Sequence, residues 1–372
     1  MKRVTGYWKF IIVYAVLLVV LNILSRITVF CDVYTDHVFH LWTDTYGRMT
    51  GMFSFSVGEV MIILAIVAVI AAIIIGISLL FLRKRKRKGY KLFAIRYLKG
   101  MLLLAMTTGL LYSLNCSMLY GCSTLVLNDK EDSDYTVSQV ETLRTYMTEM
   151  CNTLAKEFDR DADGNLVADF DMKEEVRKAM SGLAEEYPRF SGYISAPKPI
   201  RGSHYMYYTN LIGIYFPFSL EANYSTYLND ANFPYTACHE LAHLKGYIYE
   251  NEADYFAFLA CIGSDNPLLQ YSGYINVLQY LDDDYYSMVD LETYEQQVQI
   301  EDQVWKDMYC YTDETVEEVE AVDSIISEEV VAEAGETFTE TYLDYYGAEA
   351  NYSEVTKLVL RYYDGMLYET GD

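Results

Sequence analysis

The sequence predicts a mainly helical α+β protein in which three N-terminal transmembrane helices precede a folded domain. Apolar runs at about 8–24, 58–82 and 100–120 each approach the roughly 20 residues that a helix needs to cross a bilayer. After residue 121, amphipathic helical patterns surround a region of short strand-like runs. We therefore expect a membrane anchor over 1–121 and a second domain over 122–372.

The distribution of basic residues predicts how the anchor is oriented. The short loop after the second apolar run, 83–91, contains seven Lys and Arg and no acidic residue. Such loops remain in the cytoplasm. The N-terminus is also basic, whereas the loop at 25–57 is not. Three crossings then place residues 122–372 outside the cytoplasm, in a multi-pass protein of the cell membrane whose spans contact lipid.

Charge is divided unevenly between the two parts. Residues 1–121 hold 14 of the 28 Lys and Arg but only four of the 53 Asp and Glu, so the remainder is strongly acidic. Nucleic acid demands a positive surface, and no nucleic-acid partner is expected. The seven cysteines show no repeated CxxC spacing. Cys116 and Cys122 are close enough in sequence to pair, while free buried thiols are the alternative.

Helical spacing of apolar residues indicates helices over 136–158 and 172–187, the latter stopped by Pro188. Tyr, Ile, Phe and Pro in short runs indicate strands within 193–235, for example 212–218. From Pro234 the pattern is mainly helical, and the acidic stretch 312–340 is typical of a solvated helix face or of a mobile segment.

An acidic loop begins like a calcium-binding EF-hand loop, with Asp159, Asp161 and Asp163 at alternate positions before Gly164. The twelfth position, where a bidentate Glu is required, is Phe170. A plain acidic turn between two helices is therefore favoured over a calcium site, and the sequence leaves both open.

The motif that carries chemistry is His239-Glu240-Leu241-Ala242-His243. Two histidines four residues apart share one face of a helix and can bind one metal ion. Zinc in such a site lowers the pKa of its bound water to about 7, and Glu240 is placed to take the proton. Pro234 suits the first turn of this helix and Gly246 suits its end.

Catalytic zinc usually has three protein ligands. If the chain turns at Gly246 and a second helix begins near Glu250, then Glu250 can bind the ion. Asp254, four residues on, can accept a hydrogen bond from a ligand histidine. Glu252 points elsewhere on that helix and is the weaker candidate.

The HExxH motif followed by Glu250 and Asp254 resembles the glutamate-type zincin metallopeptidases, although HExxHxxG is also similar to the metzincin pattern, with Tyr249 where a third histidine stands. The run 233–246 with 250–261 is similar to an uncharacterised bacterial family that combines N-terminal membrane spans with a zinc-peptidase-like domain. Segments 217–218, 221–223 and 271–274 match that family as well. The resemblance implies a zincin-like domain and a site, but no particular substrate.

In zincins, an edge strand upstream of the active helix binds extended peptide, and residues 213–223 stand in the corresponding order. A later Tyr or His often stabilises the oxyanion, for which Tyr271, Tyr274 and His204 are candidates.

The predicted function is therefore a zinc-dependent metallopeptidase that cleaves a peptide or protein substrate. Its zinc ligands are His239, His243 and Glu250, its general base is Glu240, and Asp254 orients a ligand. The alternative is a membrane sensor or scaffold that binds zinc or peptide without turnover. Glu240 favours the enzyme, because a pure binding site does not need it.

Overall fold

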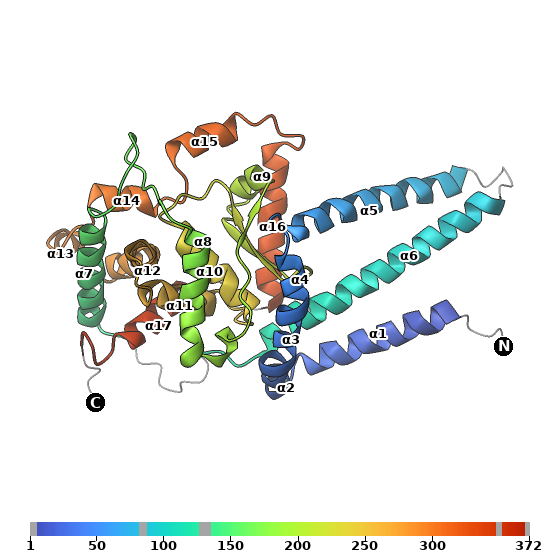
Figure 1. Ribbon diagram of the computed structural model, residues 1–372, viewed down its shortest axis with the longest axis horizontal. Helices are drawn as coiled ribbons and strands as arrows, with labels where there is room; N and C mark the ends of the chain where they lie inside the picture. The colour runs from blue at the N-terminus through green and yellow to red at the C-terminus, as the bar shows by residue number, and fades with distance from the viewer. Residues whose placement is uncertain (1–5, 82–87, 126–134, 347–351, 369–372) are drawn as a thin grey trace. The chain divides into compact units, whose positions relative to one another are not determined.

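The computed structural model describes residues 6–81, 88–125, 135–346 and 352–368 (Figure 1). The chain divides into two compact units. The first contains residues 1–122 together with the short segment 216–221, and the second contains 123–215 and 222–372. The basic run predicted to lie in the cytoplasm falls largely within 82–87, outside the described residues.

Three apolar helices dominate the first unit: α1 (Gly6–Leu24), α5 (Val57–Phe81) and α6 (Lys88–Tyr112). Each is long and apolar enough to cross a membrane, which confirms the three predicted spans at this level. The third span begins well before the expected residue 100, because α6 starts at Lys88. It continues through η4 (Ser113–Ser117) and η5 (Leu119–Gly121), and the helical run that could cross the membrane covers Gly89–Gly121.

The connection between the first two spans, residues 25–57, is helical over most of its length. Short α-helices alternate there with π-helical turns in one continuous run from Thr28 to Gly51. The five pieces are α2 (Thr28–Tyr34), η1 (Thr35–Phe39), α3 (His40–Trp42), η2 (Thr43–Gly47) and α4 (Arg48–Gly51). Buried side chains recur in this run every four residues, and a search for the 3.6-residue period of an α-helix does not detect that spacing.

Segment 216–221 is held in the first unit by hydrogen bonds. The buried carboxylate of Glu221 accepts from the backbone N–H groups of Val57 (3.2 Å) and Gly58 (2.7 Å), at the start of α5. A carboxylate at this end of a helix satisfies free N–H groups and favours the helix dipole. Thr50 donates to the carbonyl of Ser219 (2.8 Å).

The second unit contains a small sheet of β1 (Lys198–Ile200), β2 (Gly213–Phe216) and β3 (Glu221–Ser225), in the order β1-β3-β2. β1 runs parallel to β3, with Lys198 opposite Asn223. β2 is therefore an edge strand. Strands were expected in this region, but the run predicted over 212–218 is shorter because residues 217–218 leave the strand.

Helices make up the remainder of the second unit, as the sequence predicted. α7 (Val137–Leu154) begins with a capping box between Thr136 and Gln139. The helix expected over 172–187 ends at Gly182, and the 3₁₀ turns η6 (Leu183–Glu185) and η7 (Pro188–Phe190) follow it. The others in chain order are α8 (Met172–Gly182), α9 (Ser203–Tyr208), α10 (Phe233–Leu244), α11 (Glu250–Ile262), α12 (Pro267–Met288), α13 (Leu291–Glu295), α14 (Asp302–Met308), α15 (Asp313–Glu320), α16 (Glu328–Tyr346) and α17 (Tyr352–Tyr362).

The core of this unit lies where α10 and α11 pack against each other and against α8 and α12 (Figure 1). α17 packs on α11 and α12, and α7 packs on α12. α11 is buried on nearly every side, and Phe256 and Phe258 are fully buried. Apolar packing thus fixes α10 and α11, the two helices that carry the predicted site residues, and limits how far those side chains can move.

A buried ion pair joins α7 to α12. Arg144 Nε donates to Asp282 Oδ1 at 2.6 Å, and both side chains are buried. Tyr294 also donates to Asp282 Oδ2 at 2.9 Å, and its ring lies against the guanidinium. Removal of one partner would leave the other charged and buried.

We expect Arg144→Met to lower the free energy of unfolding of the full chain by about 3–5 kcal/mol, because the buried Asp282 would lose its only charged partner in the described pair and keep the Tyr294 hydroxyl alone. The matched control is Lys156→Met, which breaks the exposed Lys156–Glu301 pair (2.8 Å) and should cost at most about 1 kcal/mol. The measurement is thermal unfolding of the detergent-solubilised protein. Equal losses in the two variants would contradict the assigned role of the buried pair.

Candidate metal centre

The two helices of the predicted site are joined by a tight reversal. α10 ends at Leu244, Gly246 adopts φ +95°, and α11 begins at Glu250. Positive φ is accessible to glycine without the steric cost that a side chain brings. The Tyr247 N–H bonds to the Ala242 carbonyl at 3.2 Å and closes the end of α10. The break at Gly246 and the second helix near Glu250 are thus both present.

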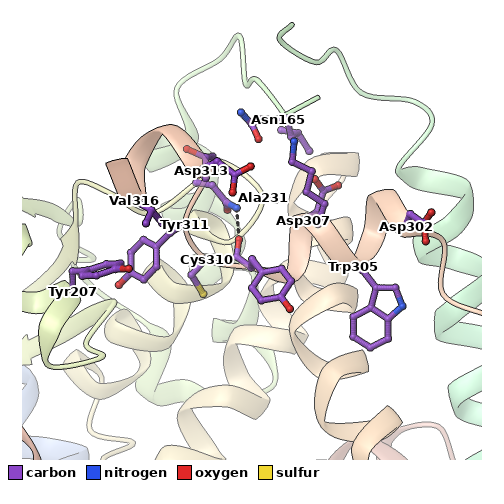
Figure 2. A pocket seen from close by; sticks show the side chains of 15 residues that line it. Asn165, Tyr207, Ala231, Asp302, Trp305, Asp307, Cys310, Tyr311, Asp313 and Val316 are labelled. Carbon is purple, nitrogen blue, oxygen red and sulfur yellow. Dashed lines mark hydrogen bonds between the residues drawn. The ribbon is translucent and has the colours of Figure 1, made fainter. Parts of the chain in front are cut away.

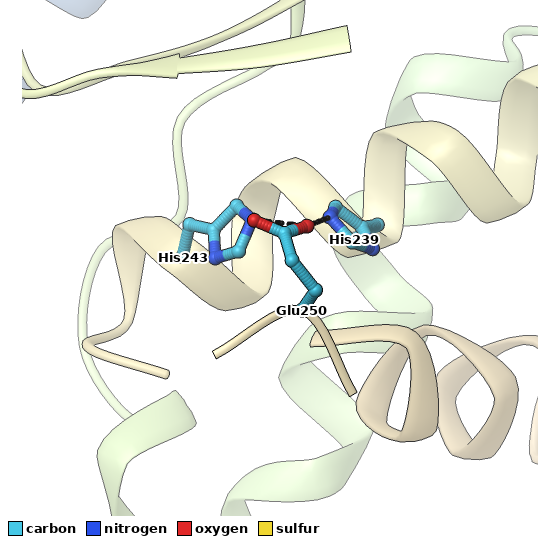
Figure 3. Close-up of side chains that lie close together, drawn as sticks. All are labelled: His239, His243 and Glu250. Atoms are coloured by element: carbon cyan, nitrogen blue, oxygen red, sulfur yellow. Dashed lines mark hydrogen bonds and ion pairs between the residues drawn. The ribbon is translucent and has the colours of Figure 1, made fainter. Parts of the chain in front are cut away.

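This reversal brings Glu250 between the two histidines (Figure 3). Its Oε2 atom lies 3.0 Å from His239 Nε2 and 3.6 Å from His243 Nε2. One donor atom from each of the three residues lies within 4.8 Å of the other two. The three side chains therefore converge on a space that one ion can occupy.

The other ring nitrogen of each histidine has an acceptor. His239 Nδ1 lies 2.7 Å from Asp254 Oδ1, and His243 Nδ1 lies 2.8 Å from the carbonyl oxygen of Tyr247. A carbonyl only accepts, so Nδ1 of His243 carries the proton. In the neutral ring, the Nε2 lone pair then points toward Glu250. Asp254 imposes the same tautomer on His239.

Charge in the cluster favours a bound cation. Burial lowers the pKa of His239, but Asp254 and Glu250 outweigh it and hold that pKa well above 6.5. The same balance, with Glu250 as the opposing carboxylate, raises the pKa of His243. Burial raises the pKa of Glu250, yet the two imidazoles bring it below its usual range. A field that retains protons on the rings also attracts a metal ion in their place.

Glu240 lies beside the cluster but outside it. Its side chain is buried, and its Oε2 atom has no hydrogen-bond partner among the described residues. Burial raises the pKa of Glu240 to about 7, although the two imidazoles and a backbone hydrogen bond from Tyr215 lower it. A carboxyl with this pKa can accept and return a proton near neutral pH.

Strand β2 passes directly over Glu240, a feature that sequence reasoning missed. A Cβ atom at Gly213 would overlap Glu240 Oε1 and lie 2.8 Å from its Cγ. The signal was present, because a glycine inside a strand often marks a close approach. Tyr215, two residues on, faces His243 with ring centroids 6.3 Å apart.

The remaining glutamate weighed as a third ligand is committed elsewhere. Glu252 is buried, and its Oε1 accepts from the backbone N–H of Leu125 at 2.6 Å. It belongs to α11, as Glu250 does, but it is not part of the converging group.

Within the described part of the chain, the three oxyanion candidates make their contacts away from the cluster. Tyr271 is fully buried and donates to Asp307 Oδ2 at 2.6 Å. Tyr274 packs against aromatic rings of the core, and His204 packs on its neighbour Tyr205.

The acidic loop is organised by its own hydrogen bonds. Asp161 Oδ1 accepts from the backbone of Asp163 (3.0 Å) and of Asn165 (2.8 Å). Across the described ranges, the converging group at His239, His243 and Glu250 has no counterpart that includes these aspartates. The geometry therefore favours the plain turn. The seven cysteines are free thiols, six of them buried.

A cavity of about 750 Å³ lies elsewhere in the second unit, beside α14 and α15 (Figure 2). Trp305, Tyr309 and Tyr311 contribute rings, and Asp302 and Asp313 contribute carboxylates. No member of the histidine cluster lines it. The cavity and the cluster are separate features of the unit.

Comparisons with known proteins place the chain in a family without placing it near a characterised relative. No curated protein and no solved structure matches it. One family model, described as Protein of unknown function (DUF3810), matches residues 34–360, which include most of the first unit and the whole histidine cluster. The chain therefore belongs to the DUF3810 family of proteins of unknown function.

Proposed function

We propose that this chain is a zinc-dependent metallopeptidase, anchored in the cell membrane by its three apolar helices. The observation that carries the proposal is the position of Glu250 between the two Nε2 atoms, beside a buried Glu240 that makes no part of that group. A third ligand and a separate base are what an HExxH site requires for hydrolysis.

The donor set fits zinc. Two imidazole nitrogens and one carboxylate make a three-ligand set typical of catalytic zinc, which leaves a coordination position open. When bound, the ion supplies Lewis-acid chemistry that polarises a carbonyl and acidifies water. His239, His243 and Glu250 would hold it, while Asp254 and the Tyr247 carbonyl keep the rings in the required tautomer.

Glu240 would act as general base and then as general acid. Its Oε2 atom has capacity for a proton, and a pKa of about 7 allows it to take one from water and return it to the leaving amine. Gly213 contributes by leaving room for the side chain.

The substrate class follows from β2. As an edge strand, it offers backbone groups to which an extended peptide can add as a further strand. It passes over Glu240, so a peptide bound there would run past the base and the proposed zinc site. The substrate is therefore a peptide or an extended segment of a protein. By the distribution of basic residues, residues 122–372 lie on the extracytoplasmic side.

The metal site can be tested by elemental analysis of the purified full chain. We expect about one zinc per chain, as in other three-ligand catalytic sites, and its loss in His239→Ala/His243→Ala and in Glu250→Gln. Glu252→Gln is the matched control, since it alters a buried carboxylate of the same helix outside the cluster and should retain the metal. Wild-type protein that binds no zinc, even when zinc is supplied, would exclude the proposal.

Glu240→Gln should retain zinc and lose hydrolysis by about 10²–10⁴-fold, because an amide cannot accept the proton. Cleavage of a mixed peptide library by the full chain, followed by mass spectrometry, measures this effect. The exposed Glu185→Gln should be unchanged. Full activity in Glu240→Gln would rule out this mechanism. Stoichiometric zinc without any cleavage by the wild type would instead favour the sensor or scaffold.

Gly213→Ala provides a second test that leaves the metal ligands intact. The added methyl group would displace the Glu240 carboxylate, and a misplacement of about 1 Å can reduce the rate by about 100-fold. We expect zinc content to be unchanged and kcat to fall. Gly182→Ala, where the new methyl group meets no atom within 4 Å, is the control. Equal kcat in the two variants would show that the close approach of Gly213 to Glu240 is not needed for the function of Glu240.

A further inference from the structure

The helical run from Thr28 to Gly51, here called the connecting helix, joins the ends of the first two apolar helices. Its side chains form rows with a spacing of four residues. In an α-helix, such rows rotate about 40° with each step around the axis. The wider π-helical turns at η1 and η2 compensate for this rotation. Each row can therefore stay on one side of the helix along its length.

One row is buried in the first unit, and it contains Cys31, Thr35, Phe39, Thr43 and Gly47. The next row is polar and at least partly exposed, and it contains Asp32, Asp36, His40, Asp44 and Arg48. The connecting helix thus has a packed side and, next to it, a side suited to water.

The remaining surface of the connecting helix is open and mostly apolar, and His37 and Thr45 are its exposed polar residues. Val29 is 75% exposed, Leu41 62% and Met49 63%. Aromatic rings join them, and Trp42 is 38% exposed. Exposed apolar side chains in such number mark a surface that another phase or molecule covers. This surface, here called the apolar face, consists of Val29, Phe30, Val33, Val38, Leu41, Trp42 and Met49.

The position of the connecting helix indicates what covers that face. It starts where α1 ends and finishes where α5 begins, so if both helices cross a bilayer, its two ends lie at the same membrane surface. In Figure 1 it runs across the ends of α1, α5 and α6 rather than alongside them. A helix in that orientation lies in the plane of the interface.

We propose that the connecting helix is an interfacial membrane helix whose apolar face is buried in the boundary between lipid headgroups and acyl chains. The polar row then faces water, and Trp42 lies at the depth where tryptophan is enriched in membrane proteins. This inference rests on α1 and α5 crossing the membrane. It does not depend on the chemistry of the histidine cluster.

Burial of the apolar face does not require lipids with a charged headgroup. The polar row carries three aspartates against Arg48, so attraction to anionic headgroups contributes little. Burial of apolar area supplies the binding instead, at about 25 cal/mol for each Å² removed from water. Neutral phosphatidylcholine is therefore sufficient, and it is the lipid for the test.

Tryptophan fluorescence can measure the depth of Trp42, because the chain contains only Trp8, Trp42 and Trp305. The full chain is placed in phosphatidylcholine nanodiscs, with and without lipid brominated high on the acyl chains. Double Trp→Phe variants leave one tryptophan at a time. Trp305, in the second unit, is 39% exposed and thus matches Trp42 in exposure.

We expect brominated lipid to quench Trp42 and Trp8, and aqueous iodide to quench Trp305. A ring buried about 5–10 Å into the headgroup and acyl boundary lies within reach of bromine and away from iodide. In a chain with all three tryptophans replaced by Phe, Val38→Trp should respond to brominated lipid. Asp36→Trp, from the polar row, should respond to iodide.

The other outcomes overturn the proposal in distinguishable ways. If Trp8 is not quenched by lipid, α1 does not cross the bilayer and the premise fails. If Trp8 responds to lipid but Trp42 responds to iodide, the spans remain and the interfacial helix is wrong. If Trp42 is protected from both quenchers, protein covers the apolar face, as in contact with a second copy of the chain.

Discussion

The reversal at Gly246 is the constraint on which the candidate site depends. On an unbroken helix, Glu250 would stand about 10 Å beyond His243, at a rise of about 1.5 Å per residue. The positive φ of Gly246 allows α11 to return toward α10, so that Glu250 lies between the two rings. The same turn presents the Tyr247 carbonyl to His243. One backbone conformation thus positions a ligand and selects the tautomer of another.

The surroundings of the reversal hold it in place. The ring of Tyr247 packs on Phe256 of α11, with centroids 4.1 Å apart, and stacks on Phe190 of η7. Lys245, almost wholly buried, donates to the carbonyls of Ser191 (2.7 Å) and Tyr193 (3.0 Å). These contacts keep the two helix ends together before any ion binds. Little reorganisation would then be needed to form the proposed metal site, which is a requirement for precise ligand geometry.

Local patterns in the sequence were sufficient for much of this arrangement. The spacing of the histidines, Gly246 and the Glu250–Asp254 pair together predicted two helices with a break between them, because each signal acts over a few residues. The carbonyl of Tyr247 could not be predicted as a partner of His243, since every residue has a carbonyl. The approach of Gly213 to Glu240 joins residues far apart in sequence, and a strand glycine does not name the residue it meets. The connecting helix was missed because its rows have a spacing of four residues.

Segment 216–221 joins β2 to β3 and is hydrogen-bonded to the start of α5. β2 ends at Phe216 and β3 begins at Glu221, and the residues from 216 to 221 belong to the first unit. Glu221 is fixed there by two N–H groups of α5 and by Ser219 (2.6 Å). A fragment that began at residue 123 would keep Glu221 and its bond from Ser219 but lose both N–H donors, and a buried carboxylate with fewer hydrogen bonds is less stable. The turn between β2 and β3 would then have to rearrange, and β2 is the strand that passes over Glu240. Because residue 123 onward lacks these two donors, the full chain is the form in which the proposed chemistry should be measured.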